Sequence, residues 1–196
     1  MTTKLNPYDY KCCGKDNIEG KRVSLYRFKN IYNENYIAEV FHYENSVYAI
    51  KYYLKNHRDS NKRYNITYSK DFLEKKKVNT GALNFFRVMD TVLTIAQKEI
   101  ISKDNKASFG FLGAPKEIEM NKKKNKKNIN NDKTISNTKR YKVYSLYARR
   151  YYNPQYFEYI DSKTSSILIL RNNKNKDILT PEVIQNYILK EIIPNL

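Results

Sequence analysis

Residues that build disulfides and metal sites are scarce in this chain of 196 residues. The two cysteines, Cys12 and Cys13, are adjacent, and adjacent cysteines rarely bridge each other because the required geometry strains the backbone. No second cysteine pair completes a zinc site, and the only histidines are His42 and His57. We therefore expect free thiols in a reducing compartment, and neither a metal nor another cofactor.

Several other signatures are also missing. No apolar run reaches the roughly 18 residues of a membrane span, and segment 1–7 lacks the apolar stretch of a secretory signal. We therefore expect a soluble, cytoplasmic protein without membrane contact. No Gly-rich phosphate-binding or dinucleotide-binding pattern occurs, and neither histidine accompanies a recognisable nucleophile motif. These absences argue against an NTPase, a dinucleotide enzyme or a hydrolase.

Positive charge is what the chain has in excess, because 37 Lys and Arg against 20 Asp and Glu give a formal net charge of +17. Such a field attracts polyanions, so we expect a nucleic acid, or else an acidic protein, as the partner. A second interpretation stays open, since Lys, Asn, Tyr and Ile are the residues that an AT-rich genome encodes by default. The apolar fraction of 40% suffices for one hydrophobic core, which predicts a single domain over residues 1–196.

The first half of the chain reads as an irregular arm followed by strands. Residues 1–21 are polar and contain Pro7, Gly14 and Gly20, which indicates an irregular N-terminal arm. Apolar and polar residues then alternate with the period of a strand. The predicted strands, which together suggest a four-stranded antiparallel meander, are 22–29, 36–42, 47–54 and 64–68.

Helices and strands mix in the second half. A wide apolar stripe at helical spacing predicts a helix that is capped by Asn79 or Thr80 and ends near Ile101. The next predicted elements are a strand at 107–113, a helix at 139–152, strands at 157–160 and 165–170, and a helix that Thr180 caps. The fold class is therefore α+β, with a meander followed by helix, strand, helix, two strands and a helix.

Two basic segments are the candidate polyanion contacts. Residues 115–137 are rich in Lys and Asn, which predicts a mobile loop insertion. Its candidate residues are Lys122, Lys123, Lys124, Lys126 and Lys127. The helix that follows adds Lys139, Arg140, Lys142, Arg149 and Arg150 beside a tyrosine stripe. Cations on phosphates and a tyrosine on a base are one interpretation; a core-facing tyrosine stripe with a solvated basic back is the other.

The order of the elements resembles the GCN5-related acyltransferase fold, in which a meander is also followed by helix, strand, helix and two strands. Asn137, Arg140, Val143 and Tyr144 form the pattern N-x-x-R-x-x-V-Y, which is similar to the family's N-x-x-A-x-x-L-Y. The resemblance implies that Tyr144 is a general acid and that Asn137 contacts coenzyme A. The family's phosphate-binding loop corresponds to Lys77–Ala82, where Gly81 is the one glycine and Val78 replaces the expected Gln or Arg.

A second resemblance is to small uncharacterised proteins of Bacteroidota and their phages. It rests on Phe109–Ala114 and Thr138–Tyr144, and it implies a bacterial or phage origin. The sequence therefore predicts a non-catalytic basic domain that binds a polyanion, most of all nucleic acid. The alternatives are an acyl-coenzyme A transferase with a degenerate cofactor loop, and a structural or interaction protein of a phage virion.

Overall fold

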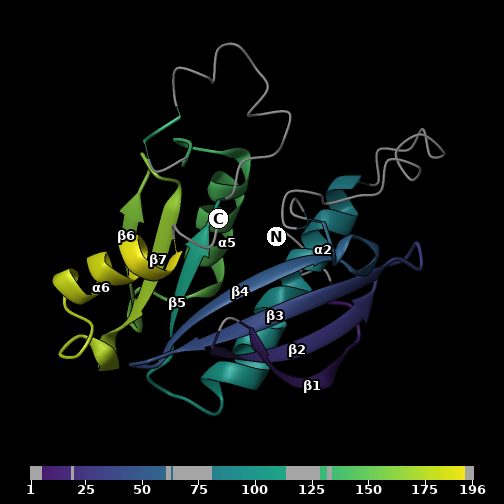
Figure 1. Ribbon diagram of the computed structural model, residues 1–196, viewed down its shortest axis with the longest axis horizontal. Helices are drawn as coiled ribbons and strands as arrows, with labels where there is room; N and C mark the ends of the chain where they lie inside the picture. The colour runs from purple at the N-terminus through teal and green to yellow at the C-terminus, as the bar shows by residue number, and fades with distance from the viewer. Residues whose placement is uncertain are drawn as a thin grey trace. The chain divides into compact units, whose positions relative to one another are not determined.

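Strands and helices of this chain build an α+β fold around one seven-stranded mixed sheet (Figure 1). A computed structural model describes residues 6–18, 20–60, 63, 81–113, 129–131 and 134–192. The strands are ordered β1-β2-β3-β4-β5-β7-β6 across the sheet. By its internal contacts the chain divides into two compact units, the first comprising Met1–His42 and Ile50–Asp104 and the second Tyr43–Ala49 and Asn105–Leu196.

The meander consists of β1 (Tyr10–Ile18), β2 (Lys21–Lys29), β3 (Asn35–Tyr43) and β4 (Val47–Leu54). The alternation predicted for β2 is confirmed, because Ser24, Tyr26 and Phe28 are buried on one face. Phe28 lies opposite Tyr36 of β3, and the two rings stack with their centroids 5.2 Å apart. Burial of these aromatic pairs gives the meander its core.

The prediction of an irregular arm over residues 1–21 is wrong for residues 10–18, which form β1. Residues 10–18 pair with β2 along their length, with a bulge between Cys12 and Gly14, where Gly14 has a φ of 122°. Seven of the nine residues in β1 are exposed, so the strand has no apolar alternation that a sequence pattern could reveal. Backbone hydrogen bonds define this strand, and its side chains do not.

Helix α2 (Gly81–Ile95) runs on into η3 (Ala96–Ile101), which confirms the predicted long helix up to Ile101. Its apolar face is buried through residues such as Val88, Val92 and Ile95. The segment before β1 packs on this helix through Tyr8. The Tyr8 amide donates to Thr91 Oγ1 (2.8 Å) and its hydroxyl donates to Asn84 Oδ1 (2.8 Å).

The second unit contains the helices and strands predicted for the C-terminal half. They are β5 (Ser108–Leu112), α5 (Lys139–Tyr151), β6 (Phe157–Ser162), β7 (Ile167–Asn172), η4 (Asn173–Asn175), α6 (Pro181–Tyr187) and η5 (Ile188–Ile192). β5 is parallel to Val47–Ala49 of β4 and antiparallel to β7, and β7 is antiparallel to β6. Ile167, Ile169, Leu179 and Ile184 form the core between β7 and α6.

Two predicted segments lie wholly or mostly outside the described residues. The first is the predicted strand at 64–68. The four-stranded meander that is observed consists of β1 to β4. The second is the loop at 115–137, of which only 129–131 and 134–137 are described. Thr134 and Ile135 are buried, and Ile135 bridges to Ile129, so packed chain resumes before the predicted loop end. No helix in the described part of the chain is long and apolar enough to cross a membrane.

Candidate nucleic-acid interface

Helix α5 carries the candidate cations, and its start is fixed by a buried polar cap. Thr138 is the N-cap residue, and its Oγ1 accepts a hydrogen bond from the Tyr141 amide (3.1 Å) while donating to the Gly113 carbonyl (2.6 Å). Asn137, which precedes the cap, adopts a φ of 53°. A Cβ at Gly113 would overlap Tyr141, so the end of β5 approaches the helix too closely for any other residue.

One face of α5 is basic and exposed. An α-helix turns 100° per residue, so residues three, seven and eleven apart share a face. Four cations and one apolar residue occupy this exposed arc: Lys139, Lys142, Leu146, Arg149 and Arg150. The helix contains no acidic residue, and its cations extend over about 16 Å at 1.5 Å per residue. We call Lys139, Lys142, Arg149 and Arg150 the α5 basic face.

Arg140 does not belong to this face, although the sequence proposed it as a phosphate contact. Its side chain is only 4% exposed, and it lies on the inner side of α5 with Tyr141, Tyr147 and Ala148. The position follows from helical geometry, because Arg140 is seven residues from the buried Tyr147, and this spacing puts both side chains on the same side of α5. This candidate is corrected to a buried arginine.

The two arginines of the basic face are positioned by neighbouring side chains. Arg149 forms an ion pair with Asp161 of β6 (3.3 Å), and its guanidinium lies 5.1 Å from the centre of the Tyr159 ring. Arg150 lies 5.6 Å from the ring centre of Tyr151. Arg149 remains 55% exposed, and an exposed pair of this kind contributes little stability, so the guanidinium is accessible to an anion that competes with Asp161.

The lysines of the predicted loop lie outside the described residues: Lys122, Lys123, Lys124, Lys126 and Lys127. Their contribution to a polyanion site therefore stays a prediction from the sequence. Of the ten cations that the sequence proposed as polyanion contacts, four lie together on the α5 basic face.

The residues implied by the acyltransferase resemblance fall in different parts of the fold. Tyr144 is half-buried on α5, and its ring centre lies 6.4 Å from that of Phe111 on β5. Asn137 is exposed just before the helix, and its amide donates to the Lys163 carbonyl (2.9 Å). Gly81 is the first residue of α2 and belongs to the first unit, whereas Asn137 and Tyr144 belong to the second.

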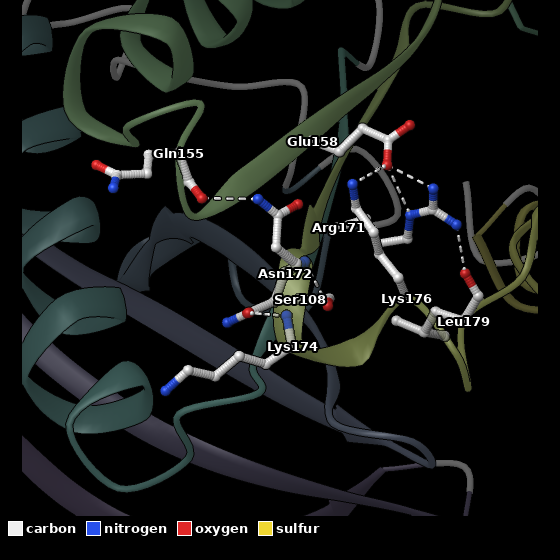
Figure 2. A network of polar contacts seen from close by, with 9 residues as sticks. Ser108, Gln155, Glu158, Arg171, Asn172, Lys174, Lys176 and Leu179 are labelled. Atoms are coloured by element: carbon white, nitrogen blue, oxygen red, sulfur yellow. Dashed lines mark hydrogen bonds and ion pairs between the residues drawn. The ribbon is translucent and has the colours of Figure 1, made fainter.

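A polar network at the end of β7 is held together by hydrogen bonds and ion pairs among its own residues (Figure 2). Arg171 donates from Nε and Nη2 to Glu158 Oε2 (3.1 and 2.5 Å) and from Nη1 to the Leu179 carbonyl (2.8 Å). Lys176 pairs with the same carboxylate oxygen (3.3 Å). The hydrogen bond from Arg171, more than that from Lys176, holds the Glu158 pKa below its ordinary value. These contacts join β6, β7 and the chain before α6.

Asn172 extends this network into the core. Its amide nitrogen donates to Ser108 Oγ (3.0 Å), and its side-chain Nδ2 donates to the carbonyls of Asn105 (3.0 Å) and Ala107 (3.3 Å). Its Oδ1 accepts from the amide of Lys174 (2.9 Å). A fully paired buried amide of this kind holds strand ends together and leaves no group to offer a ligand.

The contact between Ser24 and His42 in the first unit was not predicted from the sequence. Ser24 Oγ of β2 and His42 Nε2 of β3 lie 2.9 Å apart. The residues are 18 positions apart in the chain, and only the register of two strands brings them together. No sequence motif predicts such a pair.

Comparisons with protein-family models, with curated proteins and with solved structures give no match for this chain. In the part of the chain that the structure describes, no group of three or more His, Cys, Asp or Glu side chains is arranged to hold a metal ion.

Proposed function

We propose that this protein binds nucleic acid through the α5 basic face and catalyses no reaction there. One observation supports the proposal above all: four exposed cations share one face of a helix that contains no acidic residue. Phosphates of a nucleic-acid backbone recur at intervals of several ångströms, so a cationic face about 16 Å long can contact several of them at once.

The surroundings of the face suit backbone contacts better than base reading. Lys139 and Lys142 are exposed on the first turn of α5, and Arg149 and Arg150 lie near its end. Guanidinium groups suit phosphate oxygens because they donate two parallel hydrogen bonds. Leu146, which is 66% exposed in the middle of the face, offers only an apolar contact. We therefore expect sequence-independent binding that is sensitive to salt.

The test is a comparison of two variants with the same net charge. In the first, all four residues of the α5 basic face are changed to Gln. In the matched control, four exposed lysines of the first unit are changed to Gln: Lys11, Lys29, Lys55 and Lys98. Fluorescence anisotropy with labelled single-stranded and duplex DNA and RNA gives the affinities.

We expect the first variant to bind about ten- to a hundredfold more weakly than the natural chain, because four phosphate contacts are lost. The control should change affinity far less. Equal losses in the two variants would mean that net charge alone attracts the polyanion, and the proposal for α5 would then be abandoned.

The acyltransferase alternative is a second candidate, supported by the element order. The observed order of β1 to β4, α2, β5, α5, β6 and β7 is the order that the resemblance expects. Tyr144 follows β5 on α5, as the family's tyrosine does.

Acetyl-coenzyme A distinguishes this candidate from nucleic-acid binding. A ligand that binds only the native state raises the melting temperature, with a stabilisation of about 2.7 kcal/mol at a hundred times its dissociation constant. A shift that Asn137→Ala reduces would support the acyltransferase, because the resemblance implies that Asn137 contacts coenzyme A. An unchanged melting temperature at millimolar ligand would eliminate it.

A further inference from the structure

A second cluster of cations lies on the meander, and strand register defines it. In the pairing of β1 with β2, Lys15 lies opposite Ser24 and Asn17 lies opposite Arg22. Directly opposed residues in antiparallel strands project to the same face. Residues two apart on one strand do so as well, so Lys15, Ser24 and Arg22 share one face.

His42 joins this face from β3. Ser24 lies opposite Val40, and His42 is two residues beyond Val40, so its side chain projects to the same side. The hydrogen bond between Ser24 Oγ and His42 Nε2 (2.9 Å) agrees with this placement. Ser24 is buried and His42 is half-buried, so the serine fixes the ring at the boundary between the packed face and the solvent.

Two cations of the described strands, Arg22 and Lys15, act on His42. Burial lowers the pKa of His42, and the nearby Arg22 and then Lys15 lower it further. Both cations are exposed, and within the described residues neither forms an ion pair with a carboxylate. Nearby cations disfavour the protonated imidazole, and an anion bound beside them would offset this repulsion.

The acidic side chains of the described strands point away from this cluster. Asp16 lies opposite Val23 and Glu39 lies opposite Leu25, which puts both on the other face of the meander. Glu99 belongs to η3 and not to a strand. It accepts a hydrogen bond from the Tyr10 hydroxyl (3.1 Å) and forms an ion pair with Lys103 (2.8 Å). The described parts of β1 to β3 therefore present no carboxylate on the face of Lys15 and Arg22.

We propose that Lys15 and Arg22, beside the Ser24–His42 pair, form a binding site for a doubly charged oxyanion of the phosphate class. Lys15 and Arg22 supply the charge and the hydrogen-bond donors. His42 adds a third positive charge when it is protonated, so binding of the anion favours the imidazolium. The affinity for an anion of constant charge therefore rises as the pH falls through the titration range of His42. This site is independent of α5.

Two sources can supply this chemistry, and the experiment separates them. One is a free anion, for which sulfate is the probe because it stays doubly charged across the pH range, with inorganic phosphate as the second probe. The other is the terminal phosphate of a nucleic acid, for which a short oligonucleotide with a 5′-phosphate is compared with the same oligonucleotide carrying a 5′-hydroxyl.

The measurement is an NMR pH titration of the two histidine side chains in the intact chain, since only His42 and His57 contribute signals. We expect sulfate to raise the pKa of His42 relative to sodium chloride at the same ionic strength. His57, the internal control, should not respond. Arg22→Gln and Lys15→Gln should each raise the pKa of His42 without sulfate, and should weaken sulfate binding about two- to fivefold.

Lys29→Gln is the matched control on β2, because Lys29 is exposed and lies far along the strand from Arg22. It should leave both the pKa of His42 and the sulfate response unchanged. Equal responses of His42 and His57, or a His42 response that survives in Arg22→Gln and Lys15→Gln, would overturn the site. A response to the 5′-phosphorylated oligonucleotide but not to sulfate or phosphate would overturn the free anion as its ligand.

Discussion

Tyr8 is the residue that ties the N-terminal segment to α2. Its ring is 6% exposed, stacks with Phe28 at 6.3 Å and lies 4.1 Å below the Arg87 guanidinium. Its hydroxyl donates to Asn84, whose side chain is fully buried. The residue therefore combines apolar burial, a cation–π contact and a buried hydrogen bond in one position.

Tyr8→Phe should lower the free energy of unfolding by about 1–2 kcal/mol, because it leaves the buried Asn84 Oδ1 without its donor. Urea denaturation measures the change. Tyr156→Phe is the control, since Tyr156 is 58% exposed, and it should have almost no effect. A loss as small as that of the control would mean that the Tyr8 hydroxyl contributes nothing to stability.

The ion pair between Glu158 and Arg171 should make the stability of the protein depend on pH. Its pKa is lowered from 4.5, mainly by the hydrogen bond from Arg171. A carboxyl whose folded-state pKa is depressed contributes stability above its unfolded-state pKa, and this stability is lost as the pH falls through the folded-state value. Glu158→Gln should therefore be less stable than the natural chain at pH 7, and this difference should shrink as the pH falls below about 4.3 and disappear below the lowered folded-state pKa of Glu158. A difference that is independent of pH would contradict the ion pair.

At the scale of elements, the sequence predicted those strands and helices whose side chains alternate between core and solvent. β2 and α2 have such patterns, and α6 has a cap followed by Pro181 at its first position, which the structure also has. β1 has no pattern because seven of its nine residues are exposed. The Ser24–His42 pair could not be predicted either, since it depends on the register between β2 and β3.

The burial of Arg140 could not be predicted from the sequence, for a different reason. Helical periodicity predicted the tyrosine stripe of α5, and Tyr147 and Ala148 are indeed buried. The width of the buried face depends on how closely α5 approaches β5 and β7, which is set by Gly113 and Thr138. A charged residue at the border of the stripe therefore cannot be assigned to core or solvent from its position in the chain.

The two helix caps provide a paired prediction at this scale. Thr138→Ala should destabilise the protein by about 1–2 kcal/mol more than Thr180→Ala, although both remove an N-cap hydroxyl. The reason is that Thr138 Oγ1 is buried and also donates to the Gly113 carbonyl, whereas Thr180 is half-buried and accepts a long hydrogen bond from the Val183 amide (3.4 Å). Equal losses in chemical denaturation would show that the contact with Gly113 contributes no stability.

At the scale of the whole molecule, exposed positive charge occurs in both units. The α5 basic face lies in the second unit, and the cluster of Lys15 and Arg22 lies in the first. Composition gave the total of +17 but not this distribution. A chain whose lysines reflect codon usage alone should show salt effects that are independent of which cations are removed.

The salt dependence of nucleic-acid binding tests the central claim most directly. The slope of log affinity against log salt concentration counts the phosphates that the protein neutralises, at about 0.9 for each phosphate of duplex DNA. Replacing the four residues of the α5 basic face by Gln should therefore reduce the slope by about 3 to 4, while the variant that loses Lys11, Lys29, Lys55 and Lys98 keeps the slope of the natural chain. An unchanged slope in the α5 variant would contradict the account.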